Sequence, residues 1–366
     1  MKVAIVHYWL VTMRGGEKAL QALLELFPEA DIYTHVYNPA AMPESINKHT
    51  VYTSYINKLP FAKKMYQKYM PLMPNALLSF NLQDYDLIIS SESGPAKGVV
   101  PNPDAYHLCY CHSPMRYLWD MYHDYFREAG FLSKFFMKRL VPSLRIWDIT
   151  SANMVDRFAT NSNFVAKRIM RTYNRNADVI YGPVNVEKYF ALERKPSDFY
   201  LFFGQLTDYK RADIAMKACI ASGRKIVVAG SGKLKKTERH FYEKSGLVSF
   251  KGRVSDEEAL ELYASARALI FPGIEDLGLV PIEANAAGCP VIAFGKGGVL
   301  DTIQEGVTGL FFNEQTESSL IKALDQFESM ENQFRDRAVF TAHVKQFSSD
   351  AFKEKILRLV AERKRI

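Results

Sequence analysis

Two carboxylates, Glu275 and Glu283, stand eight residues apart on either side of an expected helix start. Gly278 gives the backbone freedom at the turn between them, and a proline three residues later suits a first helical turn, where its missing N–H is no loss. The N–H groups of Gly278, Leu279 and Val280 are then free at a helix N-terminus, where anions bind. Two carboxylates would repel a bare phosphate. The arrangement therefore indicates a ligand with hydroxyl groups on both sides of its phosphates, such as a nucleoside diphosphate sugar.

Other residues with useful chemistry follow other expected strands, at the ends where α/β proteins bind ligands. Gly15 and Gly16 come after the first strand and allow a ligand to approach the backbone closely. They do not form the G-x-G-x-x-G pattern, so a nicotinamide dinucleotide is not expected. His112 follows a second strand, and Lys210 follows a third. The stretch 229–233 ends in Gly-Lys but lacks the spacing of a phosphate loop, so it is interpreted as a strand-to-loop turn.

The elements that position these residues alternate between apolar strands and helices, which is typical of parallel sheets covered on both faces. A stretch with two prolines and no periodicity, residues 182–197, separates two such sets. A chain of 366 residues is longer than a single hydrophobic core usually accommodates. We therefore expect domains at 1–182 and 183–346, followed by a C-terminal helical segment at 347–366. The strands are expected at residues 2–9, 31–36, 85–90, 106–110 and 156–160 in the first half and at 200–203, 225–229, 248–250, 268–271 and 291–294 in the second.

Several segments together resemble the retaining glycosyltransferases of family 4, which have the GT-B fold. Glu275 and Glu283 resemble the E-x7-E signature of that family, and residues 204–211 and 252–256 resemble its loops around the donor diphosphate and the nucleobase. The HSPMRYLWD sequence at 112–120 resembles the O-antigen-type mannosyltransferases that use GDP-mannose. The resemblance implies an α/β fold of two Rossmann-like domains that face each other across a cleft, with a C-terminal helix that crosses back to the N-terminal domain.

The resemblance also implies roles for single residues. Three are implied to be catalytic: His112 contacts the transferred sugar, Lys210 neutralises the leaving diphosphate, and Glu275 holds sugar hydroxyls. The implied donor-binding residues are Gly15, Gly16, Gln205, Arg211, Arg253, Val254, Gly278, Leu279, Val280 and Glu283, of which Glu283 accepts the ribose hydroxyls. The family has an arginine where this chain has Gln205. Because glutamine brings no charge, transition-state stabilisation rests more on Lys210.

The implied reaction moves a hexose, with mannose favoured, from a nucleoside diphosphate sugar to a lipid-linked oligosaccharide in cell-surface polysaccharide synthesis, with retention of configuration. The favoured donor is GDP-mannose, and the acceptor is a polyprenyl-diphosphate-linked glycan. No Asp-x-Asp stands on a suitable loop, so neither a metal nor another cofactor is expected. The alternatives are a transferase for a different UDP- or GDP-sugar, and a sugar-nucleotide-binding GT-B protein with weak catalysis, which the residue at 205 suggests.

The composition is that of an ordinary globular chain, with 48% hydrophobic and 24% charged residues. No apolar run is long enough to cross a bilayer. Four scattered cysteines form no disulfide framework, which agrees with a reducing cytoplasm. The net charge of +7 predicts an attraction to polyanions, but no nucleic-acid-binding motif accompanies it, so nucleic acid is not an expected partner.

Two basic segments, residues 57–74 and 131–147, interleave lysines with aromatic residues. Such segments lie on anionic membrane surfaces. The expected membrane face consists of Lys58, Lys63, Lys64, Lys68, Lys134, Lys138 and Arg139. The alternative is that the aromatic residues belong to the core and the lysines are merely solvated. We expect a cytoplasmic protein that associates peripherally with the inner face of the cytoplasmic membrane.

Overall fold

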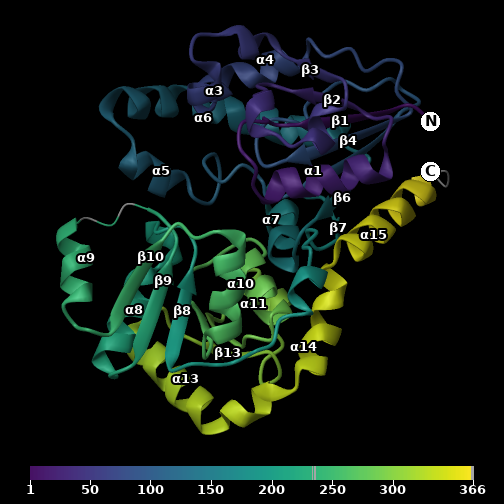
Figure 1. Cartoon of the computed structure of the whole chain (residues 1–366). Helices are drawn as coiled ribbons and strands as arrows, with labels where there is room; N and C mark the ends of the chain where they lie inside the picture. Colours follow the sequence, from purple (N-terminus) through teal and green to yellow (C-terminus); the bar gives the residue numbers. More distant parts are fainter. Residues whose placement is uncertain (233, 235, 364–366) are drawn as a thin grey trace. The chain divides into compact units, whose positions relative to one another are not determined.

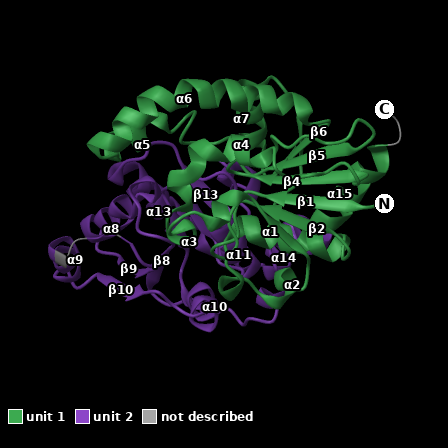
Figure 2. Ribbon diagram, turned by 90° about the horizontal axis from the view of Figure 1, so that it is seen from above, with its two compact units in different colours: residues 1–183, 352–366 green, residues 184–351 purple. Residues whose placement is uncertain are grey.

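The computed structural model describes residues 1–232, 234 and 236–363 of the chain. Lys233, at the end of the expected turn, and residues 364–366, at the end of the expected C-terminal segment, lie outside the described residues. The chain divides into two compact units (Figure 2). Unit 1 comprises Met1–Pro183 and Phe352–Ile366, and unit 2 comprises Val184–Ala351.

Unit 1 contains a seven-stranded sheet in which every paired strand runs parallel to its neighbour. The strands are β1 (Val3–His7), β2 (Asp31–Thr34), β3 (Val51–Thr53), β4 (Leu87–Glu92), β5 (Tyr106–Cys111), β6 (Arg157–Thr160) and β7 (Ala177–Val179). Their order is β3-β2-β1-β4-β5-β6-β7, so the direction of winding reverses between β1 and β4. Ligands of open α/β sheets bind at the carboxyl ends of the strands beside such a reversal.

Helices cover both faces of this sheet (Figure 1), and β1, β4 and β5 in its middle are fully buried for that reason. In β1, Val3 and Ile5 belong to one hydrophobic cluster, whereas Ala4 and Val6 belong to another. The longer helices of unit 1 are α1 (Gly15–Leu26), α5 (Tyr122–Glu128), α6 (Phe131–Ser151) and α7 (Asn163–Tyr173). Its short turns of helix are η1 (Pro39–Ala41), α2 (Glu44–Asn47), η2 (Tyr55–Lys58), α3 (Ala62–Met65), η3 (Tyr66–Leu72), α4 (Met73–Leu77) and η4 (Ala152–Met154).

The last helix, α15 (Ser349–Glu362), packs on unit 1. Its Phe352 and Ile356 side chains are buried in the same cluster as Val3 and Ile5 of β1. Its end is held by an ion pair of 2.7 Å between Glu362 and an arginine of β6. The C-terminal helix therefore returns to the N-terminal part of the chain, as the fold-class prediction stated.

Unit 2 contains a second, six-stranded parallel sheet of the same winding, in the order β10-β9-β8-β11-β12-β13. Its strands are β8 (Phe199–Phe203), β9 (Lys225–Ala229), β10 (Val248–Gly252), β11 (Leu269–Phe271), β12 (Val291–Phe294) and β13 (Gly309–Phe312). Its helices are η5 (Glu187–Tyr189), η6 (Asp208–Lys210), α8 (Ala212–Ala221), α9 (Lys236–Glu243), α10 (Asp256–Ser265), α11 (Leu279–Ala286), α12 (Val299–Thr302), α13 (Glu317–Met330), η7 (Glu331–Arg335), α14 (Arg337–Val344) and η8 (Lys345–Phe347). Two Rossmann-like units with parallel sheets confirm the predicted α/β fold class.

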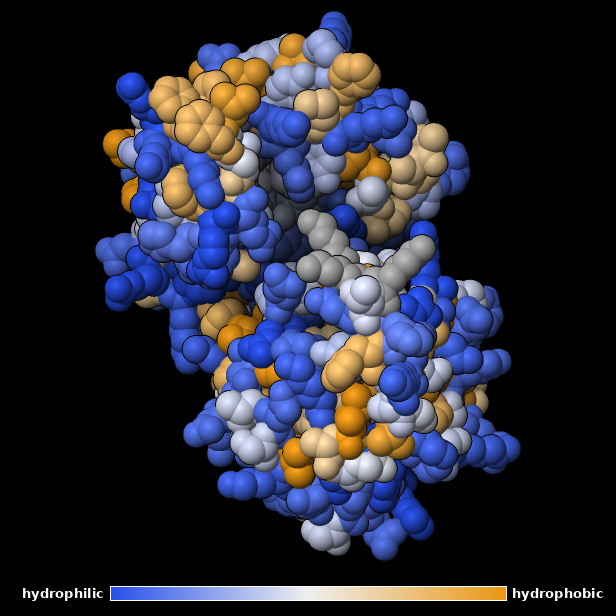
Figure 3. All heavy atoms as spheres, turned by 90° about the vertical axis from the view of Figure 1, so that its left-hand side faces the viewer, coloured by the Kyte–Doolittle hydropathy of each residue, from blue (hydrophilic) through white to orange (hydrophobic). Residues whose placement is uncertain are grey.

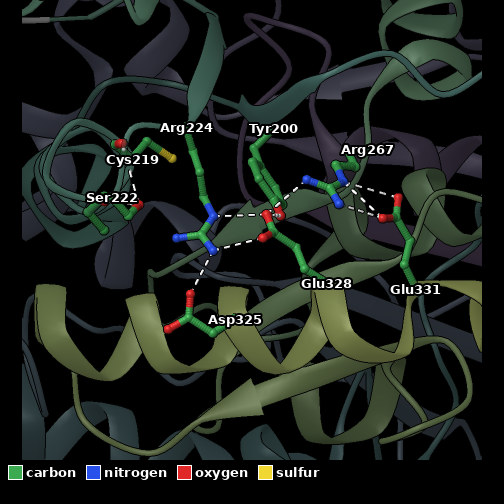
Figure 4. Close-up of polar contacts among 9 residues, drawn as sticks. Tyr200, Cys219, Ser222, Arg224, Arg267, Asp325, Glu328 and Glu331 are labelled. Atoms are coloured by element: carbon green, nitrogen blue, oxygen red, sulfur yellow. Dashed lines mark hydrogen bonds and ion pairs between the residues drawn. The ribbon is translucent and has the colours of Figure 1, made fainter.

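An ion-pair network ties α13 to strands of unit 2 at their amino ends (Figure 4). Glu328 accepts hydrogen bonds from Arg224 and Arg267, both at 2.8 Å, and from the Tyr200 hydroxyl at 2.6 Å. The Arg224 hydrogen bonds outweigh burial and lower the pKa of Glu328 to about 2. Arg267 also pairs with Glu331 at 2.6 Å. The amino ends of β8, β9 and β11 are thus occupied by structural contacts, and the opposite ends carry the candidate site.

Candidate functional site

Lys210 and Glu275 meet at the winding reversal of unit 2. Lys210 follows β8 and Glu275 follows β11, which are neighbouring strands on the two sides of the reversal. Their side chains form an ion pair of 2.7 Å between Lys210 Nζ and Glu275 Oε1, and only 14% and 20% of these side chains are exposed. Two residues that lie 65 positions apart in the sequence, and that the resemblance implied to be catalytic, are therefore in direct contact.

Glycines allow the two loops to approach this closely. A Cβ atom at Gly273 would lie 2.8 Å from the Lys210 Cα, and one at Gly204 would lie 3.1 Å from its Nζ. On the other side, the Gly298 N–H donates to the Glu275 carbonyl oxygen at 2.8 Å. Backbone atoms exclude a side chain at Gly273, whereas at Gly204 a side chain would displace the lysine and would be strained by the φ of +147°. The turn 297–298 therefore supports the loop that carries Glu275.

Helix α11 starts beside this loop. Gly278 is its N-cap with a φ of +88°, and no side chain caps the helix start. The first N–H groups of a helix have no intrahelical acceptor, and they carry the positive end of its dipole. Glu283 lies one turn into the helix and accepts a hydrogen bond from the Tyr263 hydroxyl at 3.2 Å. Burial, with the nearby Glu283 carboxylate, raises the pKa of Tyr189.

The remaining donor-binding predictions in unit 2 lie on neighbouring loops. Gln205 is exposed directly after β8. Arg211 forms two hydrogen bonds with the carboxylate of Asp213, at 3.0 and 3.1 Å. Arg253 is exposed and Val254 is half-buried in the loop after β10. Arg211 is thus engaged at the start of α8, whereas Lys210 is directed to Glu275.

The glycine pair of unit 1 lies within the first turn of a helix. Gly15 and Gly16 are the first two residues of α1. A Cβ atom at Gly16 would lie 2.3 Å from the Tyr8 hydroxyl oxygen, so only glycine fits there. Glu17 is buried, and its carboxylate accepts the Arg14 N–H at 2.9 Å.

His112 lies directly after β5 and contacts residues that the sequence analysis did not single out. Its Nε2 lies 2.9 Å from the Ser91 hydroxyl, which lies 3.0 Å from Nδ1 of His7. Burial, followed by the neighbouring His7, lowers the pKa of His112 to about 3. Ser91 and His7 are near the carboxyl ends of β4 and β1, the two strands at the reversal. The sequence feature that could have identified Ser91 and His7 is their position at the ends of expected strands.

A buried charge cluster beside this site was also missed. Lys97 is fully buried, donates to Glu92 at 2.8 Å and contacts Asp148 of α6. Trp119, within the 112–120 segment, donates to the other oxygen of Asp148 at 2.7 Å. Burial lowers the pKa of Lys97, but Asp148 and Glu92 outweigh it and raise the pKa. The cluster therefore fixes the segment that follows His112 to α6.

The basic residues of the expected membrane face all belong to unit 1. Lys58, Lys63, Lys64, Lys68, Lys138 and Arg139 are exposed, and Lys134 is half-buried. In the first segment the apolar residues are mostly not free for lipid, because Tyr66, Tyr69 and Met70 pack against a hydrophobic cluster. Phe61 and Leu72 are exceptions, and they are 74% and 43% exposed. The core interpretation is thus correct for most aromatic residues of 57–74.

None of the helices in the described part of the chain has the combination of length and apolar composition that a membrane span requires. In α6, by contrast, one set of apolar residues of the second segment is exposed, although Val141 and Leu144 of the same helix are buried in a hydrophobic cluster. Phe131, Leu132, Phe135, Phe136 and Ile146 are all more than half exposed.

Comparisons with known proteins bear on this arrangement. Residues 186–347 match the model of the family described as glycosyl transferases group 1. The alpha-1,3/1,6-mannosyltransferase ALG2 of Homo sapiens is 27% identical over 62% of this chain and 64% of its own length. The glycogen synthase of Pseudomonas syringae pv. syringae is 28% identical over 49% of this chain and 36% of its own length. The chain thus spans about one to two thirds of the curated relatives it matches.

The fold is shared over the whole chain. The crystal structure of Anabaena Alr3699/HepE in complex with UDP superposes with a TM-score of 0.71, covering 99% of this chain and 100% of that one at 16% identity. An identity this low shows the shared fold alone. The part of the chain that resembles the glycosyl transferases group 1 in sequence is residues 186–347, and it contains Lys210, Glu275 and Glu283.

Proposed function

We propose that this chain is a retaining hexosyltransferase that uses a nucleoside diphosphate sugar. The observation that carries the proposal is the contact between Lys210 and Glu275 at the winding reversal of unit 2, beside the uncapped N-terminus of α11. A lysine and free N–H groups suit a diphosphate, and two carboxylates nearby suit the hydroxyl groups on either side of it. The region that matches the family model contains all of these groups.

In the proposed reaction, unit 2 stabilises the leaving group. Lys210 and the first N–H groups of α11 stabilise the charge that grows on the diphosphate as the glycosidic bond breaks. Glu275 accepts hydrogen bonds from the sugar, and Glu283 accepts them from the ribose. His112 of unit 1 contacts the transferred hexose. These groups supply the positive charge and the hydrogen bonds without a metal ion.

The proposed donor is GDP-mannose, and the proposed acceptor is a polyprenyl-diphosphate-linked glycan in cell-surface polysaccharide synthesis. Support comes from the resemblance of residues 112–120 to O-antigen-type mannosyltransferases and from the mannosyltransferase among the relatives. The competing donor class is the UDP-sugars, because the superposed Anabaena protein is described in complex with UDP.

A thermal-shift series with GDP, UDP, GDP-mannose and UDP-glucose tests the donor class. A ligand that binds only the folded protein stabilises it by about 2.7 kcal/mol at one hundred times its Kd. We expect GDP and GDP-mannose to raise Tm in the wild type and to do so less in Glu283→Ala. A Tm shift with the uridine nucleotides alone would mean that the donor is a UDP-sugar instead of GDP-mannose. No Tm shift with any nucleotide would reject the proposal.

Gln205 supports the second candidate, a sugar-nucleotide-binding protein with weak catalysis. Nucleotide binding without transfer to any lipid-linked acceptor, and without donor hydrolysis, would favour it over the transferase.

We further propose that unit 1 lies on the inner, anionic face of the cytoplasmic membrane. The upper part of the face in Figure 3 shows apolar side chains gathered among hydrophilic ones. On α6, Phe131, Phe135 and Ile146 recur at helical spacing on the outward side. Lys138 and Arg139 are exposed on the same helix. Apolar side chains flanked by lysine and arginine suit a layer of anionic lipid headgroups, where the acceptor is proposed to reside.

A further inference from the structure

Four polar side chains form a continuous line across the winding reversal of unit 1. Glu17 Oε1 faces His7 Nε2 at 3.7 Å. His7 Nδ1 lies 3.0 Å from the Ser91 hydroxyl, and that hydroxyl lies 2.9 Å from His112 Nε2. Glu17, His7 and Ser91 are each at most 1% exposed. Each member of the line therefore has few alternative partners, and one assignment of protons constrains the next.

The first assignment is made at His7. Its Nε2 is shielded from water and has no hydrogen-bond partner among the described residues. The nearby carboxylate of Glu17 attracts an N–H at this position and repels a lone pair. A neutral His7 therefore carries its proton on Nε2, and its Nδ1 is a bare acceptor.

The second assignment follows at Ser91, which has one proton and two lone pairs. The bare Nδ1 of His7 requires Ser91 to donate its proton to His7. The Ser91 oxygen then accepts from Nε2 of His112. His112 is neutral at ordinary pH, chiefly because burial lowers its pKa to about 3. With its single proton on Nε2, His112 has a bare Nδ1.

We propose that His7 and Ser91 are positioning residues that hold His112 in the Nε2–H tautomer, so that its Nδ1 offers a lone pair to a hydroxyl group of the transferred sugar. The sugar contact rests on the proposed function, whereas the tautomer does not. The opposite order of donors, with His7 doubly protonated, would leave His112 with a proton on Nδ1 and make it a donor.

Nitrogen-detected NMR of the histidine rings distinguishes these orders, because a bare ring nitrogen and a protonated one have well-separated 15N shifts. Two buried histidines provide internal references. His107 Nδ1 lies 2.8 Å from the Met154 carbonyl oxygen and carries its proton there. His35 Nε2 lies 3.0 Å from the Pro95 carbonyl oxygen and carries its proton there. We expect the ring of His112 to match the pattern of His35 in the ligand-free wild type.

A matched pair of variants tests the line itself. Ser91→Ala removes the hydroxyl that contacts His112, and Ser90→Ala removes an equivalent hydroxyl that contacts His107 Nε2 at 2.9 Å. Both serines are fully buried on β4. We expect His112 to become a mixture of tautomers in Ser91→Ala only, whereas His107 keeps its tautomer in both because Met154 still fixes it.

The turnover assay then separates this inference from the proposed function. We expect Ser91→Ala to lower kcat at least tenfold with a donor Kd within twofold of wild type, and Ser90→Ala to keep kcat within threefold. A wild-type His112 with its proton on Nδ1, or an unchanged His112 tautomer in Ser91→Ala, would overturn the proposal. An altered tautomer with unchanged kcat would overturn the sugar contact.

If neither variant folds, the wild-type spectrum decides. A chain that turns over no nucleotide sugar but shows the Nε2–H tautomer would retain the positioning and reject the function.

Discussion

At the scale of single residues, the contact between Lys210 and Glu275 gives a half-buried lysine side chain an ionic partner within unit 2. Glu275 neutralises Lys210 at 2.7 Å. A bound diphosphate would share the lysine with that carboxylate. The sequence predicted both residues, because each follows an apolar strand and matches a family motif. It did not predict their contact, since that depends on the pairing of β8 with β11.

Replacing Lys210 with alanine should lower turnover more than it lowers donor affinity, because charge on the diphosphate grows as the bond breaks. The loss of one preorganised donor of this kind costs about 10²–10³ in kcat. Steady-state kinetics and calorimetry with the donor check the two quantities. Turnover within a few-fold of wild type would assign the diphosphate contact elsewhere, first of all to Arg211.

Gln205→Arg tests whether the unusual glutamine leaves the site short of one positive charge. Gln205 is exposed directly after β8, so the longer side chain has room. We expect nucleoside diphosphate binding to tighten by about tenfold, which corresponds to about 1.4 kcal/mol. Gln205→Lys is the matched control with a charge but no planar fork. An unchanged affinity in both variants would mean that position 205 points away from the diphosphate.

At the scale of elements, the sequence predicted the strand of unit 2 at 225–229 with the bounds that the structure has. The boundary at the end of this strand was clear in the sequence because a glycine follows the apolar run. The segment 37–78 had no such pattern, since its short helical turns depend on tertiary packing. The sequence also did not predict the contacts of Ser91 in β4 or of Lys97 in the loop that follows it. These contacts exist only because other strands and helices pack against the two residues.

Lys97→Met should strongly destabilise unit 1, because it leaves the buried carboxylates of Glu92 and Asp148 without their cation. Removal of one partner from a buried charge cluster costs about 3–5 kcal/mol. All three tryptophans of the chain lie in unit 1, so their fluorescence during urea unfolding reports on it. Lys167→Met, at an exposed position of α7, is the control and should change stability by less than about 0.5 kcal/mol. Equal midpoints would contradict the cluster.

Unit 1 should also lose stability as the pH falls below about 6.5, the ordinary pKa of histidine. Burial lowers the pKa of His35 and of His107 to about 4. Between pH 6.5 and 4 the unfolded chain therefore binds more protons than the folded one, and stability falls on acidification. Each histidine should contribute a loss of about 2 kcal/mol between pH 6.5 and 5.

Urea unfolding followed by tryptophan fluorescence at pH 7 and pH 5 measures this loss. In His107→Gln the amide can still meet Ser90 and the Met154 carbonyl oxygen, but it does not titrate, so the loss should shrink by about one histidine's share. A pH dependence equal to that of the wild type would show that His107 is not a source of the effect.

At the scale of the whole molecule, two units of the same winding each bring chemistry to the carboxyl ends of the strands at their reversal. Unit 2 has Lys210 and Glu275 there, and unit 1 has His7 and Ser91. The sequence predicted two such domains from a repeated alternation of strand and helix. It also predicted basic surfaces, but it did not separate exposed aromatic residues from buried ones. The distinction requires the packing of η3 on its neighbours and the outward side of α6.

The membrane proposal predicts that the protein sediments with vesicles rich in anionic lipid and that two kinds of change release it. Phe131→Ser with Phe135→Ser removes apolar side chains from α6 that are 86% and 52% exposed. Lys63, Lys64 and Lys68 changed to Glu remove attraction worth about 1 kcal/mol per lysine near the surface. Phe241→Ser, at a 68% exposed phenylalanine of unit 2, is the matched control and should sediment like the wild type.

Because salt screens charges beyond about 8–10 Å, the lysine variant should differ most from wild type at low salt, whereas the phenylalanine variant should differ at every salt concentration. Donor hydrolysis should persist in both variants while transfer to a lipid-linked acceptor falls. Sedimentation equal to that of the wild type in both variants at low salt would reject this surface of unit 1 as the membrane face.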